Sequence, residues 1–324
     1  MRIIFMGTPD FAVQVLDAII NDGHEVVGVY TQPDKPKGRG KSMQFTPVKE
    51  KAIEYNIPVY QPIKVREPEV VEEMKQLKPD VIVVVAFGQL LPETILSIPP
   101  LGCINVHASL LPKYRGAAPI QRVIIDGEKE SGVTTMYMAK GLDTGDMIEK
   151  TVVPIDAKET GGTYHDKLAA AGAKLCLSTL EKLEKGTAPR IPQDDSQSCY
   201  AHMLNKAMGE LDFQKSAEEL ERLIRGLNPW PSAYTYLQGK VLKVFEADVV
   251  AEPNVTVTEN NTKADAGTIV AVDKKTFTVQ CGSGALCIRS LQLEGKKRME
   301  TAAFLLGYSV TTGMKLGKDA ESAS

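Results

Sequence analysis

Residues 102–116, with the sequence GCINVHASLLPKYRG, combine a strand pattern with polar side chains that can act in catalysis. In the first half, small or β-branched apolar residues alternate with polar ones, which predicts a β-strand. Side chains alternate between the two faces of a strand, so Asn105 and His107 are expected on the same face. Pro112 ends the regular structure, and a loop is expected up to Gly116. The sequence therefore predicts an amide and an imidazole side by side near the end of a strand.

The pair of Asn105 and His107 has two interpretations. An amide N–H and a protonated imidazole can both stabilise the oxyanion of a tetrahedral intermediate, and an imidazole can move a proton near neutral pH. The alternative is structural, with Asn105 satisfying a turn and His107 hydrogen-bonded in the core. Asp143 lies in a glycine-flanked loop after a strand-like segment, residues 133–138. A carboxylate beside an imidazole orients the ring, which favours catalysis, although Asp and Gly are also common in ordinary turns.

The first 30 residues predict a βαβ unit, with strands over residues 2–6 and 24–30 and a helix over residues 11–20. This order implies a parallel, doubly wound sheet. Residues 80–86 are almost entirely apolar, which indicates a central strand that is covered on both faces. Only Gly7 is present where a dinucleotide site needs Gly-x-Gly-x-x-Gly, so no nicotinamide cofactor is expected.

The second half of the chain changes character after a segment rich in Pro, Asp and Ser. After a helix over residues 217–227, five short segments rich in β-branched residues predict a small OB-like β-barrel. The fold class is therefore α/β: a doubly wound, mostly parallel, Rossmann-like sheet domain followed by a smaller OB-like β-barrel domain. The expected boundaries are a catalytic domain at 1–186, a linker at 187–206, an OB-like domain at 207–314 and a tail at 315–324.

The composition of the 324 residues is typical of a globular protein, with 43% hydrophobic and 24% charged residues. The formal net charge of −3 gives no global basic field, so any contact with nucleic acid must come from local patches. The five cysteines form no Cys-x-x-Cys pair, which indicates reduced thiols in the cytoplasm rather than a disulfide framework or a zinc site. No metal is expected. No signal peptide or membrane-spanning segment is expected either, because the apolar runs are too short.

Residues 31–46 have no hydrophobic period and contain several glycines and prolines, which predicts a long loop at the rim of the sheet. The cations Lys35, Lys37, Arg39 and Lys41 suit the phosphate backbone of a nucleic acid. The alternative is an ordinary solvated surface loop.

Three motifs together resemble the signature of the folate-dependent formyltransferase family. They are Asn105-x-His107, the sequence SLLP-x-YRG at residues 109–116, and the sequence DTGD at residues 143–146. The order and spacing of these motifs are specific. The resemblance covers essentially the whole chain, including KRM at residues 297–299 and FLLG at residues 304–307. It implies that Asn105, His107 and Asp143 are the catalytic residues.

The resemblance also implies where the substrates bind. The formyl donor would be 10-formyltetrahydrofolate, whose flat pterin ring presents donors and acceptors that backbone groups can meet. In the members of this family that act on tRNA, an inserted loop carries an arginine that meets the acceptor end of tRNA, and Arg39 matches it, with Lys37 and Lys41 beside it. The resemblance also implies that the OB-like domain at 207–314 binds tRNA. The implied folate-binding residues are Phe87, Gly88, Leu91, Ser109, Leu110, Leu111, Pro112, Gly141 and Leu142.

The resemblance over the whole chain is to members of the family that formylate the α-amine of methionyl initiator tRNA, which serves translation initiation. It implies a cytoplasmic enzyme, and we expect a monomer. Two alternatives stay open. One is a formyltransferase for an amino sugar or nucleotide, which would not need the cationic loop or the barrel. The other is a catalytically inactive RNA-binding module on the same scaffold.

Overall fold

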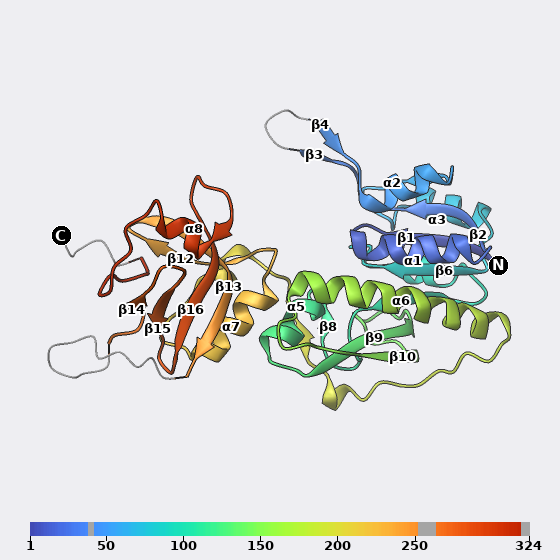
Figure 1. Ribbon diagram of the computed structural model, residues 1–324. Helices are drawn as coiled ribbons and strands as arrows, with labels where there is room; N and C mark the ends of the chain where they lie inside the picture. Colours follow the sequence, from blue (N-terminus) through green and yellow to red (C-terminus); the bar gives the residue numbers. More distant parts are fainter. Residues whose placement is uncertain (38–41, 252–263, 319–324) are drawn as a thin grey trace. The chain divides into compact units, whose positions relative to one another are not determined.

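The computed structural model describes residues 1–37, 42–251 and 264–318. The chain forms two compact units (Figure 1). The amino-terminal unit contains Met1–Pro119, Lys129–Ile155 and Tyr164–His202. The carboxy-terminal unit contains Ile120–Glu128, Asp156–Thr163 and the chain from Met203 onward. In the described residues, no helix is both long and apolar enough to cross a membrane.

A seven-stranded sheet forms the centre of the amino-terminal unit, with the order β10-β9-β7-β6-β1-β2-β5. The strands from β5 to β7 pair in parallel, whereas β9 is antiparallel to β7 and β10 is antiparallel to β9. The predicted mostly parallel sheet is therefore confirmed. The strands are β1 (Arg2–Gly7), β2 (Glu25–Tyr30), β5 (Val59–Tyr60), β6 (Val81–Val85), β7 (Cys103–His107), β9 (Glu130–Tyr137) and β10 (Met147–Pro154).

Helices cover both faces of this sheet. On one face lie α1 (Asp10–Asn21) and the long helix α6 (Gly161–Glu184), which meet where Gly172 approaches Phe11 (Figure 1). On the other face, α3 (Pro68–Gln76) and α4 (Glu93–Leu96) bury residues such as Val71, Met74 and Ile95 against β1, β6 and β7. Every residue of β6 is buried, as its VIVVV sequence predicts for a strand covered on both sides. Helix α2 (Pro47–Glu54) also belongs to this unit, whereas nearly all of α5 (Pro119–Ile125) belongs to the carboxy-terminal unit.

The segment predicted as a loop at 31–46 contains a short hairpin. Strand β3 (Lys35–Lys37) pairs antiparallel with β4 (Ser42–Gln44), and the hairpin projects away from the sheet (Figure 1). Its base is held by Lys49, whose ammonium donates to the Asp34 carboxylate and to Gln61 Oε1 at 2.8 Å. Strands β3 and β4 pair through their backbones, and their described side chains bury no apolar face. Their sequence therefore shows no alternation of apolar and polar residues from which a strand could be predicted.

The carboxy-terminal unit is an antiparallel sheet with the order β12-β13-β16-β15-β14, and β17 pairs with β16. Helix α7 (Ala217–Gly226) packs on this sheet and contributes Leu220 and Ile224 to its hydrophobic core. The five predicted strand segments match the observed ones closely, which confirms a smaller β-domain after the parallel sheet. The remaining elements are β12 (Ala233–Leu237), β13 (Lys240–Val250), β14 (Ile269–Val272), β15 (Phe277–Gln280), β16 (Ala285–Leu293), β17 (Met299–Glu300) and α8 (Thr301–Leu305).

Helix α7 begins with a capping box that makes a first prediction. Ser216 Oγ accepts from Glu219 N at 3.2 Å, and Glu219 Oε2 accepts from Ser216 N at 3.0 Å. Ser216→Ala removes the side-chain acceptor, and an N-cap of this kind contributes about 0.5–2 kcal/mol. We expect the free energy of unfolding to fall by about this amount, as measured by thermal or urea unfolding. Lys215→Ala is the control, because the exposed Lys215 side chain precedes the cap and should leave the unfolding midpoint nearly unchanged.

Candidate active site

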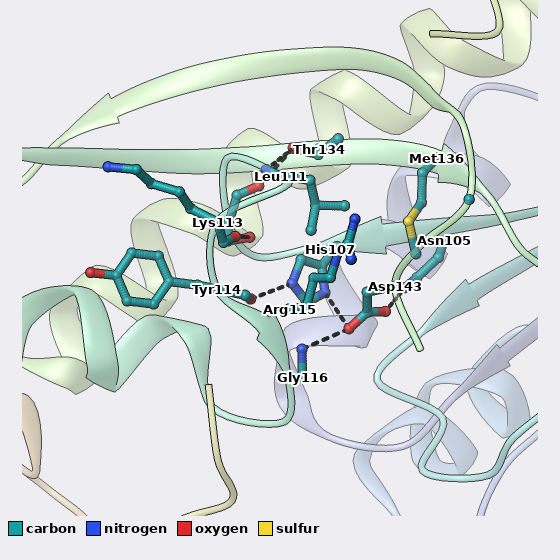
Figure 2. A network of polar contacts seen from close by, with 12 residues as sticks. Asn105, His107, Leu111, Lys113, Tyr114, Arg115, Gly116, Thr134, Met136 and Asp143 are labelled. Atoms are coloured by element: carbon teal, nitrogen blue, oxygen red, sulfur yellow. Dashed lines mark hydrogen bonds and ion pairs between the residues drawn. The ribbon is translucent and has the colours of Figure 1, made fainter. Parts of the chain in front are cut away.

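Three polar side chains converge beside strand β7. Asn105 and His107 lie two residues apart on this strand, and Asp143 reaches them from the loop between β9 and β10 (Figure 2). Asn105 Nδ2 donates to Asp143 Oδ1 at 3.4 Å, and His107 Nδ1 lies 3.7 Å from Asp143 Oδ2. The side chains of His107 and Asp143 are 7% and 10% exposed, whereas Asn105 is partly accessible. An amide, an imidazole and a carboxylate thus share one small region.

The His107 ring is held by a backbone carbonyl. Its Nε2 lies 2.9 Å from Tyr114 O, and a carbonyl oxygen can only accept, so Nε2 carries a proton and donates to it. Nδ1 is therefore the ring nitrogen that faces Asp143, at a distance too long for a direct hydrogen bond. Proton transfer by this ring in the site must use Nδ1 while the bond to Tyr114 persists.

Gly116 anchors the carboxylate of Asp143. Gly116 N donates to Asp143 Oδ2 at 2.8 Å (Figure 2). Gly116 has a φ of +113°, and a Cβ there would lie 2.7 Å from the Tyr200 ring and 2.8 Å from Ala201 O. No other residue fits this position without movement of the backbone. Because Gly116 has no side chain, its backbone N–H can come within hydrogen-bond distance of the Asp143 carboxylate.

The loop from Ser109 to Lys113 is fixed by Thr134 on the neighbouring strand β9. Thr134 Oγ1 donates to Ser109 O at 2.7 Å and accepts from Leu111 N at 3.1 Å. Ser109 Oγ donates to Lys113 O at 2.7 Å, and the Lys150 ammonium donates to Leu111 O. Burial lowers the pKa of Lys150. These bonds hold the backbone that follows His107 in one conformation.

A later part of the chain also borders the site. Strand β11 (Tyr200–Ala201) pairs in parallel with β8 (Arg115–Gly116), and Tyr114 N donates to Cys199 Sγ at 3.2 Å. Gln193 donates through Nε2 to Asp143 O and to Gly145 O, both at 2.8 Å. The sequence does not predict these contacts, because a polar residue in a segment rich in Pro, Asp and Ser carries no pattern that points to a partner about 50 residues earlier in the chain.

The nine residues predicted to meet folate fall into two groups. Phe87, Leu91, Ser109 and Leu111 are buried, and Phe87 O accepts from Thr8 Oγ1 at 3.2 Å and from Gln32 Nε2 at 3.0 Å. Their side chains are therefore in the interior, and the two bonds to the Phe87 carbonyl hold the loop after β6. The other group is accessible or partly accessible and comprises Gly88, Leu110, Pro112, Gly141 and Leu142, the last of which is 43% exposed.

Strands β6 and β7 are neighbours, with Val84 paired to Asn105, so the loop after β6 begins close to the strand that carries Asn105 and His107. The exposed Gly88 has a φ of +86° and lacks a side chain that would cover its backbone. Backbone of this kind can approach a flat ring closely. The described residues thus fit a pterin in chemistry, with apolar support from buried side chains and accessible peptide groups.

The three residues predicted to contact tRNA are Lys37, Arg39 and Lys41. Lys37 ends β3, and its side chain is not described. Arg39 and Lys41 lie outside the described residues. Their predicted contacts therefore stay predictions.

Comparisons with known proteins give the same family over both parts of the chain. The family described as "Formyl transferase" matches residues 1–180, and "Formyl transferase, C-terminal domain" matches residues 203–309. A "Methionyl-tRNA formyltransferase" from Lachnospira eligens is 56% identical over 318 residues, which cover 98% of this chain and 100% of the relative. The protein of the same name from Clostridioides difficile is 53% identical over 317 residues, with coverage of 98% and 100%.

Solved structures share the fold at low sequence identity. HypX from Aquifex aeolicus in complex with tetrahydrofolic acid has a TM-score of 0.63 and 17% identity, and the match covers 95% of this chain and 47% of HypX. An N-formyltransferase from Helicobacter canadensis, solved with folinic acid and dTDP-3-aminofucose, has a TM-score of 0.63 and 19% identity, with coverage of 92% and 99%. At these identities the likeness concerns the fold.

Proposed function

The chain belongs to the formyl transferase family, and from this membership we propose that it transfers the formyl group of 10-formyltetrahydrofolate to the α-amino group of methionyl initiator tRNA. The product is the formylated tRNA that begins translation. The observation that carries the chemistry is the meeting of Asn105, His107 and Asp143 beside β7. The observation that carries the substrate is the full-length similarity to relatives named for this reaction.

In the proposed reaction, the free α-amine attacks the formyl carbon, so that a new C–N bond forms and a tetrahedral oxyanion develops. Asn105 Nδ2 donates to this oxyanion. Collapse of the intermediate breaks the bond between the formyl carbon and N10 of the folate, and N10 takes up a proton. The proton lost by the amine and the proton gained by N10 balance.

His107 and Asp143 manage these protons in the proposal. His107 donates or shuttles a proton through Nδ1, because its Nε2–H is occupied by Tyr114 O. Asp143 holds the ring in place and relays a proton from the incoming ammonium through a water molecule. No step requires a metal, because an amide, an imidazole and a carboxylate supply the charge stabilisation and the proton transfer.

The accessible residues among the predicted folate contacts would bind the formyl donor. We propose that backbone at Gly88, Gly141 and Leu142 meets the pterin edge, while Leu110 and Pro112 lie against the folate. The buried Phe87, Leu91, Ser109 and Leu111 support these loops from behind. We further propose that the protein acts as a monomer in the cytoplasm, where translation begins.

A transfer assay tests the function directly. The protein is incubated with 10-formyltetrahydrofolate and, separately, methionyl initiator tRNA or a nucleotide-linked amino sugar. We expect formylation of the tRNA. Formyl transfer to the amino sugar alone would favour the second family activity. Tight tRNA binding without transfer to any amine would favour an RNA-binding module.

Binding of tRNA is expected to weaken as salt rises, because each phosphate contact releases counterions. Arg39→Ala removes one proposed contact, so it should weaken binding and reduce the salt slope of the logarithm of the binding constant by about one. Mobility shifts with initiator tRNA at several salt concentrations measure both effects. Lys185→Ala is the control, because Lys185 is an exposed cation that directly follows α6, outside both β3 and β4 and outside the carboxy-terminal domain. An Arg39 variant with the slope and affinity of the unaltered chain would contradict the assignment.

A further inference from the structure

Gln193 uses its whole carboxamide in contacts around the catalytic acid. Nε2 donates one proton to Asp143 O and the other to Gly145 O, both at 2.8 Å. Oε1 accepts from Arg115 twice, from Nε at 3.1 Å and from Nη2 at 2.8 Å. One side chain thus ties the backbone of the Asp143 loop to the guanidinium of Arg115.

Arg115 is held rigidly between this amide and the later segment of the chain. The residue is 9% exposed, and its Nη2 also donates to Asp195 Oδ1 at 2.7 Å. The backbone of Arg115 donates to Cys199 O at 2.9 Å. A planar guanidinium that makes a two-pronged contact has little freedom to move, so it fixes the orientation of the Gln193 amide.

Together these contacts hold Asp143 at both ends. The carboxylate is bound by the amide of Gly116, which directly follows Arg115, and the Asp143 carbonyl is bound by Gln193, which Arg115 orients. A closed ring of bonds therefore runs through Asp143, Gly116, Arg115 and Gln193. All of these residues lie within the amino-terminal unit.

The loop needs such support for two reasons. Asp143 has a φ of +52°, in the left-handed region that is unfavourable for a residue with a side chain. Its carboxylate must also stay close to two partners, 3.4 Å from Asn105 Nδ2 and 3.7 Å from His107 Nδ1. A shift of about 1 Å at a catalytic group can cost about 100-fold in rate.

We propose that Gln193 and Arg115 are positioning residues that set the Asp143 carboxylate against His107 and Asn105. Gln193, which follows helix α6 in the chain, would then complete the active site from a later part of the amino-terminal unit. This inference rests on the proposed function for the role of Asp143, and it adds residues outside the three catalytic motifs.

Two substitutions at Gln193 test the proposal. Gln193→Ala removes both donors without adding a charge, and Gln193→Glu keeps the acceptors for Arg115 but loses both donors to the carbonyls. We expect kcat for formyl transfer to fall about 10- to 100-fold in each variant, with KM for tRNA changed less than about twofold. The matched control is Gln197→Glu, because Gln197 lies exposed in the same segment and its amide donates to Asp194. A wild-type kcat in both Gln193 variants would overturn the proposal.

A double-mutant cycle separates positioning from a general structural role. If Gln193 acts through Asp143, then Gln193→Ala should cost little in an Asp143→Asn background, because the group it positions has already lost its function. Equal losses in both backgrounds would overturn the proposal. Circular dichroism and thermal unfolding check that each variant is folded.

A readout without substrates keeps this inference distinct from the proposed function. NMR spectra of the four histidine rings can be recorded on the free protein, with His107 assigned by substitution. We expect the His107 resonances to move in Gln193→Ala and to stay in place in Gln197→Glu. Unchanged His107 resonances in Gln193→Ala would contradict the positioning role. If the wild-type protein failed to formylate any tRNA while the His107 resonances moved as expected, the proposed function alone would fail.

Discussion

Replacing Asn105 with alanine is expected to lower the rate of formyl transfer about 100- to 1000-fold, the usual cost of removing one oxyanion donor. The side chain is partly accessible on β7, so its loss removes few packing contacts and the chain should stay folded. Single-turnover assays with saturating folate and methionyl-tRNA measure the chemical step, and circular dichroism checks the fold. Binding of either substrate should change little, because the donor acts on charge that develops in the transition state.

Asn21→Ala provides the control for this result. Asn21 is an exposed residue at the end of α1, and its amide donates to Asp17 four residues earlier. Its substitution should leave the single-turnover rate unchanged. A near-normal rate in folded Asn105→Ala would remove Asn105 from the proposed mechanism.

The second large effect is expected for Asp143→Asn. The new amide keeps the size of the side chain and can still offer an oxygen to Gly116 N, although its NH2 group then faces the Asn105 Nδ2 donor. Gln193 still binds the backbone carbonyl of residue 143, so the loop should keep its conformation. The negative charge that faces His107 Nδ1 is lost, and with it the group proposed to relay a proton from the amine. Proton transfer by a positioned group contributes about 100- to 10,000-fold, and we expect a loss in this range. Rapid-quench measurements over a range of pH would record it.

The matched control is Asp146→Asn, three residues later in the same loop. The Asp146 side chain is 38% exposed, and its charged partner is Arg190 at 3.8 Å. Its rate should stay within about twofold of the wild type, because a surface ion pair contributes little. If both substitutions cost the same, the effect belongs to the acidity of the loop and not to Asp143.

Regular elements with a strong burial pattern could be predicted from sequence. The apolar strand at Val81–Val85 and the strand at Cys103–His107 were predicted because a buried sheet demands alternating or continuous apolar residues. The meeting of Asn105 and His107 followed from the two-residue period of that strand. The strands of the carboxy-terminal unit followed from their β-branched composition and intervening turns.

The pairing of β3 with β4 and the contacts of Gln193 could not be predicted in this way. The hairpin is held by backbone pairing and by the polar base around Lys49, neither of which gives a hydrophobic period. Gln193 meets Asp143 across 50 residues of sequence, and only the folded chain brings them together. The loop that carries Asp143 is held by contacts with residues distant in sequence, such as Asn105 and Gln193, which no local pattern predicts. The role of Asp143 could therefore be inferred from sequence only through the family motif.

The division of the chain into units has a consequence for how this gene could be recombined. The chain passes from one unit to the other after Pro119, Glu128, Ile155, Thr163 and His202, so each unit is assembled from separate stretches of sequence. A single crossover between two relatives, placed near His202, would exchange most of the β-domain but leave Ile120–Glu128 and Asp156–Thr163 from the other parent inside it. In such chimaeras, the carboxy-terminal unit would contain segments from two parents whose side chains did not evolve to pack together. Selection would therefore favour inheritance of the whole gene over exchange of its two halves.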